Sequence, residues 1–354
     1  MSKPRPKSFG NLIVEVIRTG RCTFCGACVA ACPEDVLELQ TEAPTIKGKC
    51  TVCQTCYFSC PQTSLDLETV ERKVFGRKRK EEEKLGIMLE ACFARTLDPE
   101  ISTVGQDGGA VTAILENIIQ EKSASCAVVS TCDRDLPWKP FPNVATDRES
   151  IVLGAGTKYT PSPTLIGLVK AAQDFKGKQV AVVGTPCQVK AIRKIQTSSE
   201  ISSEIIPEDL LTVGLFCMES YSYESLIGEF LPSKAVDPTE VTKFAIKKGR
   251  FLVYSNGEER INVPLKEVKT HVRKACHSCR DFTAELADLS VGSVDAPPGW
   301  STLVLRNQKA LDAVQDAEKS GRLEVRKIPN PKETLRVTQR LSERKNQQPE
   351  KNSS

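Results

Sequence analysis

The chain has 354 residues, of which 40% are hydrophobic and 27% charged, so it is long enough for two or three domains with a substantial core. Its net charge of +4 is small and only 5% of its residues are aromatic, which excludes the basic footprint of a nucleic-acid-binding protein. No stretch approaches the roughly 18 apolar residues of a membrane span, and residues 1–20 lack the apolar core of a signal peptide. We therefore expect a cytoplasmic protein without direct membrane insertion, which could lie on the cytoplasmic face of a membrane complex only through a partner.

The cysteine count of 15 is high and odd, which suits metal ligation in a reducing compartment better than a complete disulfide framework. Eight of these cysteines form two copies of the spacing C-x2-C-x2-C-x3-C-P. The first copy is Cys22, Cys25, Cys28, Cys32 and Pro33, and the second is Cys50, Cys53, Cys56, Cys60 and Pro61. This is the spacing of bacterial two-cluster ferredoxins, in which the fourth cysteine of each copy binds the other cluster.

The interlocked spacing predicts which cysteines share a cluster. One [4Fe-4S] cluster is expected on Cys22, Cys25, Cys28 and Cys60, and the other on Cys32, Cys50, Cys53 and Cys56. A pair of zinc ribbons or a disulfide knot is the alternative. Zinc sites use two CxxC pairs separated by a longer loop, whereas each copy here places three cysteines within seven residues. The pattern therefore favours iron–sulfur clusters.

Residues 1–70 are expected to form an α+β ferredoxin-like N-terminal domain, with matching short strands at residues 36–39 and 64–67 after the two Cys-Pro turns. Residues 71–84 are strongly charged and predict a solvated linker, in which residues 77–80 could instead form a docking patch.

Residues 85–331 have the composition of a larger α/β domain. Apolar runs predict strands at 126–129, 179–183, 211–216, 287–292, 301–306 and 322–328, and helical periodicity predicts helices at 110–122, 164–175, 188–195 and 308–321. Residues 332–354 are polar and rich in lysine, which predicts a disordered tail.

Two glycine-containing loops interrupt these elements. Gly108 and Gly109 precede the helix at residues 110–122 and could cradle a phosphate, although a plain N-terminal turn is the simpler interpretation. Residues 153–163 form a loop rich in glycine and proline. The chain has no G-x-G-x-x-G after a strand, which argues against a Rossmann nicotinamide site.

Four further cysteines stand at positions where ligands bind in α/β proteins. Cys187 and Cys217 follow two predicted core strands, and Cys276 and Cys279 form a CxxC in one loop. The CxxC alone fits half a zinc site, a redox dithiol or half an iron–sulfur site. With the other two cysteines it predicts a third [4Fe-4S] cluster in preference to zinc. His277 is a weaker candidate ligand, and Cys92, Cys126 and Cys132, which have no partner spacing, are interpreted as small buried residues.

An ordered set of motifs over residues 85–310 resembles the beta subunits of coenzyme F420 hydrogenases and dehydrogenases. The motifs are Gln106-Asp107-Gly108-Gly109, Gly156-Thr157-Lys158-Tyr159, Gly184-Thr185-Pro186-Cys187-Gln188, Gly214-Leu215-Phe216-Cys217, Cys276-x-x-Cys279-x-Asp281 and Ala287-Asp288-Leu289-Ser290-Val291-Gly292. The resemblance implies a larger α/β flavin-binding domain that binds FAD and one [4Fe-4S] cluster. The N-terminal two-cluster unit makes the chain more similar to the F420H2 dehydrogenase type than to the hydrogenase type.

The resemblance also implies roles for individual residues. Cys187, Cys217, Cys276 and Cys279 become ligands of the cluster nearest the flavin. Candidates for holding FAD and shaping the coenzyme cleft are Gln106, Asp107, Gly108, Gly109, Thr112, Thr157, Lys158 and Tyr159. Lys158 is expected to meet an anionic phosphate or carboxylate. No side chain is expected to act as a catalytic acid or base, because the flavin carries the hydride chemistry.

The function implied is oxidation of reduced coenzyme F420 by hydride transfer to FAD, followed by single-electron transfer through three [4Fe-4S] clusters. The acceptor would be another subunit of a membrane-bound dehydrogenase complex or a soluble ferredoxin. Three alternatives remain: an F420-reducing hydrogenase-type subunit, another ferredoxin-linked flavin reductase, and a non-enzymatic iron–sulfur relay that lacks flavin.

Overall fold

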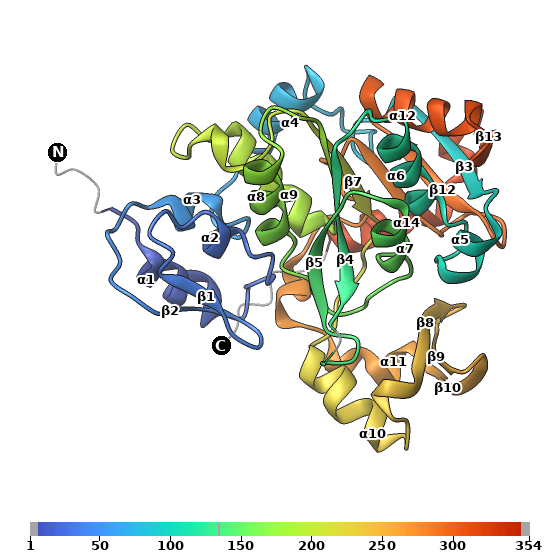
Figure 1. Ribbon diagram of the computed structural model, residues 1–354, viewed down its shortest axis with the longest axis horizontal. Helices are drawn as coiled ribbons and strands as arrows, with labels where there is room; N and C mark the ends of the chain where they lie inside the picture. Colours follow the sequence, from blue (N-terminus) through green and yellow to red (C-terminus); the bar gives the residue numbers. More distant parts are fainter. Residues whose placement is uncertain (1–5, 134, 348–354) are drawn as a thin grey trace.

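The computed structural model describes residues 6–133 and 135–347 of the chain. It comprises an N-terminal unit, a large α/β domain and a smaller unit inserted between two strands of that domain (Figure 1). The N-terminal unit and the smaller unit lie against the large domain on different sides.

The N-terminal unit is built from short elements. Its elements are α1 (Phe9–Leu12), η1 (Ile13–Ile17), α2 (Ala27–Ala30), β1 (Leu37–Leu39), β2 (Pro44–Ile46) and α3 (Thr55–Ser59). β1 and β2 pair antiparallel. Phe9, Leu12, Val16 and Leu37 form a small apolar core together with cysteine side chains. Because this core is small, bound clusters would add to the stability of the unit.

The strand predicted at residues 36–39 is present as β1, but the one predicted at residues 64–67 is wrong. The chain instead begins helix α4 (Leu67–Phe75) there. Asp66 caps this helix, because its carboxylate accepts hydrogen bonds from the backbone N–H groups of Glu68 (3.1 Å) and Thr69 (3.3 Å). The helix-capping residue Asp66 therefore decides the local structure, and the apolar alternation over residues 64–67 does not produce a strand.

The solvated linker expected at residues 71–84 is wrong in part, because most of these residues are exposed but the segment begins within α4 and pairs with the large domain. Glu71, on α4, is only 3% exposed and pairs with Arg79, which also pairs with Glu285 of the large domain. Arg77 pairs with Glu83 at 2.5 Å. Three of the four cations of the suggested docking patch therefore have ion pairs inside the molecule, and one of them, Arg79, attaches this segment to the large domain.

The large domain is organised by an eight-stranded sheet in the order β13-β3-β12-β11-β7-β6-β4-β5. The strands are β3 (Glu90–Thr96), β4 (Cys126–Cys132), β5 (Pro140–Ala145), β6 (Val180–Gly184), β7 (Leu210–Leu215), β11 (Leu289–Gly292), β12 (Ser301–Leu305) and β13 (Leu323–Lys327). The central strands β4, β6, β7 and β11 are parallel. Their continuous apolar sequences suit this place, because a parallel sheet is covered on both faces.

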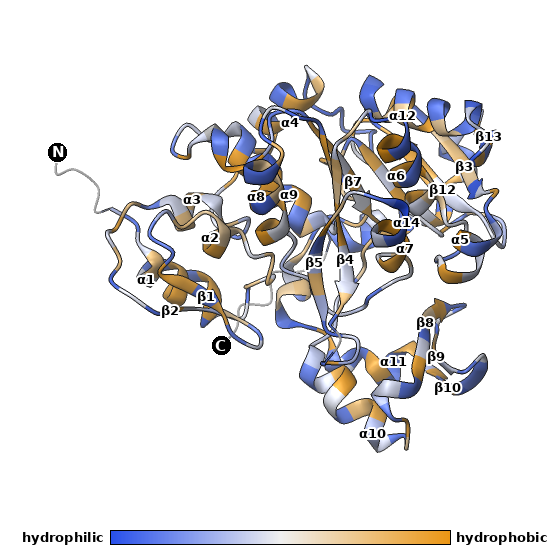
Figure 2. Cartoon of the chain, viewed as in Figure 1, coloured by the Kyte–Doolittle hydropathy of each residue, from blue (hydrophilic) through white to orange (hydrophobic). Residues whose placement is uncertain are grey.

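Helices cover both faces of this sheet, and apolar residues gather between the layers (Figure 2). The helices and turns of the domain are α5 (Pro99–Val104), α6 (Ala110–Gln120), α7 (Arg148–Leu153), α8 (Thr164–Asp174), α9 (Pro186–Thr197), η2 (Ser203–Ile205) and α12 (Gln308–Lys319). Ala127 and Val129 of β4 face α6 and α7, whereas Cys126 and Val128 face α8 and α9. This alternation follows from the two-residue period of a strand.

The inserted unit was not expected. It contains η3 (Glu224–Phe230), α10 (Leu231–Ser233), η4 (Pro238–Glu240), the antiparallel strands β8 (Val241–Lys247), β9 (Arg250–Ser255) and β10 (Glu258–Pro264), then α11 (Leu265–Val268), η5 (Lys269–His271) and η6 (Lys274–Ser278). Phe244 and Phe251 lie in its separate core. It contacts the large domain where Trp138 Nε1 donates to Val241 O (3.1 Å) and Lys243 Nζ to Gly105 O (3.2 Å).

The disordered tail expected at residues 332–354 is wrong over its first part. Residues 331–346 form α13 (Pro331–Thr334) and α14 (Arg336–Asn346), while residues 348–354 lie outside the described residues. Thr338, Ser342 and Lys345 of α14 are at most 1% exposed. Because these buried residues are polar, the helix had no apolar periodicity by which to recognise it.

A buried polar network joins α9 to the centre of the sheet. The guanidinium group of Arg193 donates to Leu286 O (2.8 Å) and Thr212 Oγ1 (2.8 Å) and pairs with Asp288 (2.7 Å). Asp288 also accepts from the backbone N–H of Thr212 and from Asn307. The Asp288 of the Ala-Asp-Leu-Ser-Val-Gly motif therefore has a structural role at the start of β11.

Candidate functional site

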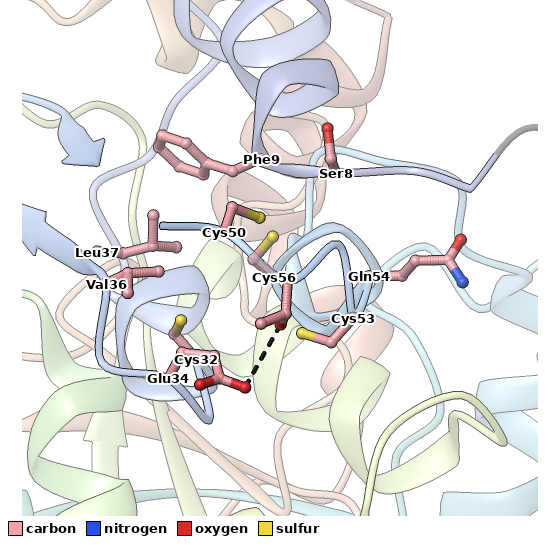
Figure 3. A pocket seen from close by; sticks show the side chains of 11 residues that line it. Ser8, Phe9, Cys32, Glu34, Val36, Leu37, Cys50, Cys53, Gln54 and Cys56 are labelled. Atoms are coloured by element: carbon pink, nitrogen blue, oxygen red, sulfur yellow. Dashed lines mark hydrogen bonds between the residues drawn. The ribbon is translucent and has the colours of Figure 1, made fainter. Parts of the chain in front are cut away.

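The eight N-terminal cysteines lie in two groups that match the predicted sets. Cys22, Cys25, Cys28 and Cys60 line one pocket. Cys32, Cys50, Cys53 and Cys56 line a second, in which the four thiols surround a common space (Figure 3). The fourth cysteine of each sequence repeat thus lies with the first three of the other repeat, as two-cluster ferredoxin spacing requires.

These thiols would repel one another if they were ionised alone. Burial, together with the neighbouring Cys53, Cys50 and Cys32, raises the pKa of Cys56 to about 12. A zinc ion holds its sulfur ligands at about 2.3 Å, so the side chains that bind it lie close together. Among the residues that the structure describes, no three His, Cys, Asp or Glu side chains are arranged in this way. Four thiolates that line one space need a positively charged centre to compensate for their charge, and the core of an iron–sulfur cluster would supply it.

The third group lies at the carboxyl edge of the large sheet. β6 and β7 are adjacent, with Gly184 opposite Gly214, so Cys187 in the first turn of α9 and Cys217 after β7 follow neighbouring strand ends. Thr185 and Gln188 form a capping box that fixes the start of α9. The sheet topology thus brings together two cysteines that are 30 positions apart.

Cys276 and Cys279 complete this third group from η6 and the residue after it. Burial raises the pKa of Cys276 to about 11, with Cys187 and Cys279 as further causes, while a hydrogen bond from Ser220 N (3.3 Å) lowers it. Burial also raises the pKa of Cys217, and Cys276, Cys187 and Cys279 contribute to that rise, so the four thiols are neighbours. His277 is exposed and does not join them.

The first and third groups are neighbours. The thiol of Cys187 is among the groups that raise the pKa of Cys25, after burial and Cys60. The backbone of Cys25 accepts from Leu165 N (3.1 Å) at the start of α8. Lys194 Nζ on α9 donates to Cys60 O (2.8 Å), so the helix that carries Cys187 also contacts the N-terminal unit.

The loop at residues 106–109 lies at the same carboxyl edge, before α6. Gly109 has φ +62°, and the carbonyl of Gly108 accepts from Thr96 N at 2.7 Å. A Cβ atom at Gly108 would lie 2.5 Å from Ser301 N and 2.6 Å from Ala94 O. Close packing against β3 and β12 therefore accounts for Gly108 without a phosphate, and Thr112, in the first turn of α6, is buried.

Replacing Gly108 with alanine should destabilise the protein by about 1–3 kcal/mol, because the new methyl group overlaps backbone atoms that cannot move without disturbing the sheet. Urea unfolding would measure the loss. Gly228→Ala is the matched control, since a Cβ there meets no atom within 4 Å. Equal stability of the two variants would contradict the packing explanation.

Lys158 closes its own loop. Its Nζ donates to Gly154 O (2.8 Å), Ala155 O (2.7 Å) and Gly156 O (3.3 Å), and burial lowers its pKa to about 8. The ammonium group that was expected to meet an anionic ligand is therefore engaged by three carbonyl groups, and Thr157 lies in the loop that it holds.

The two candidate flavin loops meet each other and the third cysteine group. A Cβ on Gly156 would lie 3.2 Å from Val104 O, and burial and then Asp107 raise the pKa of the partly exposed Tyr159. The carbonyl of Tyr159 accepts from Ser220 Oγ (3.2 Å). Gln106 Oε1 is buried without a hydrogen-bond partner among the described residues, and such an acceptor fits a donor on a bound ligand.

Two cations that contact these groups were missed by sequence reasoning. Arg273 Nη2 donates to Cys22 O (3.1 Å), and Lys345 Nζ donates to Cys217 O. Arg273 is three residues before Cys276, a spacing that could have drawn attention to it. Lys345 had no local signal, because it stands in a polar, lysine-rich segment.

Known protein families match most of the chain. Residues 91–168 and 177–331 match the N-terminal and C-terminal models of the coenzyme F420 hydrogenase/dehydrogenase beta subunit, and residues 15–38 match a 4Fe-4S binding domain. The beta subunit of coenzyme F420 hydrogenase from Methanothermobacter thermautotrophicus is 36% identical over 76% of this chain and 95% of its own length. The chain belongs to the family of coenzyme F420 hydrogenase/dehydrogenase beta subunits.

Relatives within this family differ in how much of the chain they match. One of the subunits of the F420H2 dehydrogenase from Methanosarcina mazei is 31% identical over 94% of this chain and 91% of its own length. A chain of the F420-reducing [NiFe] hydrogenase complex from Methanosarcina barkeri has 35% identity and a TM-score of 0.70, over 76% of this chain and 92% of its own. The family resemblance inferred from the motifs is thus confirmed, and with it an F420-linked oxidoreductase relationship and a 4Fe-4S binding motif.

Proposed function

We propose that this protein oxidises reduced coenzyme F420 and passes the electrons, one at a time, to a partner protein through its N-terminal unit. The observation that carries the proposal is the succession of three four-cysteine groups. The third group is at the sheet edge beside the candidate flavin loops, the first is its neighbour, and the second contains the exposed Cys53. Such a succession leads from a buried site toward the surface.

The cofactors proposed are FAD and three [4Fe-4S] clusters. FAD would lie against the loops at residues 106–109 and 157–159, where Gln106 offers an unpaired acceptor. Bound FAD would accept a hydride and the clusters single electrons, so the flavin joins two-electron to one-electron chemistry. The cysteine ligands would be the three groups described above.

The side chains of this protein would position these groups and keep water away. Ser220 links the two regions, because its Oγ donates to Tyr159 O and its N–H donates to Cys276 Sγ. Trp138 and Lys243 hold the inserted unit over the sheet edge. No catalytic acid or base is required of the chain.

The partner would be another subunit of a dehydrogenase complex or a soluble ferredoxin. The dehydrogenase assignment is favoured by the relative that matches 94% of the chain, including the N-terminal unit. A hydrogenase-type subunit is the second candidate, since three hydrogenase beta subunits are 34–37% identical over about three quarters of the chain. Among the described residues no helix has the length and apolar character to cross a membrane.

Anaerobic iron and flavin analysis, followed by an F420H2 oxidation assay with a viologen dye, tests the proposal. We expect about twelve irons and one FAD per chain, counting four irons for each cluster, and reduction of the dye that depends on F420H2. About eight irons and no flavin would indicate a relay instead. Bound FAD with no response to F420H2 would indicate a different flavin reductase.

A further inference from the structure

Helix α14 places a buried lysine against the third cysteine group. Lys345 is 1% exposed, and its Nζ donates to the backbone carbonyl of Cys217. The helix is held in register by Ser342 Oγ, which donates to Lys84 O (3.1 Å), and by Thr338, whose backbone N–H donates to Asp295 (2.7 Å). These contacts fix the helix, and the hydrogen bond to Cys217 O fixes the Lys345 ammonium group at its end.

A buried ammonium group needs an opposite charge. Removing an ion from water costs several kcal/mol unless a counter-charge compensates for it. Among the described residues Lys345 forms no ion pair with a carboxylate. Burial lowers the pKa of Lys345, but the neighbouring Cys279, Cys217 and Cys276 and, after them, Asp281 raise it. Once these thiols are ionised as cluster ligands, they would supply the counter-charge that Lys345 needs.

Two neighbouring cations, Arg79 and Arg306, are engaged elsewhere. Arg79 pairs with Glu71 and Glu285, and Arg306 donates to Leu85 O (2.6 Å) and Ile87 O (2.8 Å). Lys190, on α9, carries a further positive charge near Cys279. Lys345 differs from these three cations because its ammonium group contacts the backbone of Cys217, a member of the group.

We propose that Lys345 compensates the negative charge of the site formed by Cys187, Cys217, Cys276 and Cys279, and thereby raises the reduction potential of the cluster bound there. One-electron reduction adds a negative charge to the cluster, and a nearby fixed cation stabilises the reduced form more than the oxidised form. Lys345 is a positioning and electrostatic residue that does not ligate iron. The inference rests on the proposed function in assuming a cluster at this site.

This role also explains why α14 is folded. The family model that matches the large domain ends at residue 331, before α14 begins at Arg336. Helix α14 thus lies beyond the region that the family model matches, and its buried face is polar and ends at the cysteine group. Through Lys345 this helix brings a positive charge to the cysteine group, which a helix with an apolar buried face would not do.

The test is a redox titration of the full-length holoprotein with a chemical reductant, followed by electron paramagnetic resonance. The signal of the third cluster is assigned by its absence in Cys187→Ala. In Lys345→Met we expect the reduced-to-oxidised ratio of that cluster at a given potential to fall at least tenfold, a shift of about 59 mV for one electron. Lys345→Arg should stay near wild type, and Arg344→Met, which removes the adjacent exposed cation, should leave the signal unchanged.

Each outcome decides the proposal. An unchanged potential in Lys345→Met overturns it. If Lys345→Met fails to load the third cluster, iron analysis replaces the titration: about eight irons in Lys345→Met against about twelve in Lys345→Arg support a need for charge, whereas about eight in both overturn it. The titration uses a chemical reductant and not F420H2. If wild type failed to oxidise F420H2, the proposed function would be refuted, but the reduction potentials of wild type and Lys345→Met could still be compared.

Discussion

Alanine at Cys187 is expected to remove one cluster and to stop electron delivery, while the fold and flavin binding are retained. Changing a residue that merely supports a metal ligand costs about 10- to 100-fold, so loss of a ligand should lower F420H2-dependent reduction of a protein acceptor by roughly 100-fold or more. Iron should fall from about twelve to about eight atoms per chain. The Cys187 side chain is half-buried at the first turn of α9 and outside the apolar clusters, so the domain should still fold.

The measurement combines stopped-flow reduction of the flavin by F420H2 with steady-state reduction of a ferredoxin. Flavin reduction should proceed at the wild-type rate and ferredoxin reduction should be lost. Cys126→Ala is the matched control, because Cys126 is fully buried in β4 and belongs to none of the three groups. If Cys187→Ala loses flavin reduction although its circular dichroism and FAD content are normal, the proposed order of electron transfer is refuted.

Methionine at Arg193 is expected to lower the free energy of unfolding by about 3–5 kcal/mol, because removing one partner of a buried ion pair leaves an uncompensated charge. Arg193 and Asp288 are 4% and 3% exposed, and the pair connects α9 to the start of β11. The three hydrogen-bond acceptors of the guanidinium group, Leu286 O, Thr212 Oγ1 and Gln196 Oε1, would also lose their donor.

Chemical unfolding of the protein loaded with its cofactors would give the difference. Lys170→Met serves as the control, because Lys170 and Asp174 form an exposed pair on α8 at 3.0 Å, for which a loss below about 1 kcal/mol is expected. A similar small loss in Arg193→Met would show that the buried network is not required for stability.

The parallel strands of the central sheet could be predicted closely from the sequence because they are continuous apolar runs, whereas β3 and β5, which pair antiparallel, were not predicted. The strand expected at residues 179–183 is β6 (Val180–Gly184), and the one expected at 211–216 is β7 (Leu210–Leu215). The helix expected at residues 164–175 is α8 (Thr164–Asp174). Parallel strands are buried on both faces, so their signal is strong and local.

The inserted unit and α14 could not be predicted in this way. Strands such as β10 (Glu258–Pro264) are mostly exposed, and their charged residues conceal the alternation. In α14 the buried face carries Thr338, Ser342 and Lys345, whose partners are hydrogen-bond acceptors from distant segments. Helical spacing of polar residues does not distinguish a buried face from a solvated one.

The candidate site was predicted unevenly for a similar reason. The eight N-terminal cysteines follow a spacing that a cluster imposes locally, so the sets could be assigned before the fold was known. Cys187, Cys217 and the CxxC required the strand order of the sheet to bring them together. Lys158 illustrates the limit of motif reading, since a lysine in a glycine-rich loop serves here as a donor to its own backbone.

Helix α9 has a consequence for the rate of electron transfer. It holds Cys187 in its first turn, and two turns later Lys194 donates to Cys60 O, while Arg193 anchors the same turn to the sheet. In the proposed relay, one continuous helix would therefore fix the separation between the first and third cysteine groups. Transfer between them would be governed by tunnelling across a constant gap, and solvent viscosity, which slows carriers that swing between donor and acceptor, would leave it unchanged.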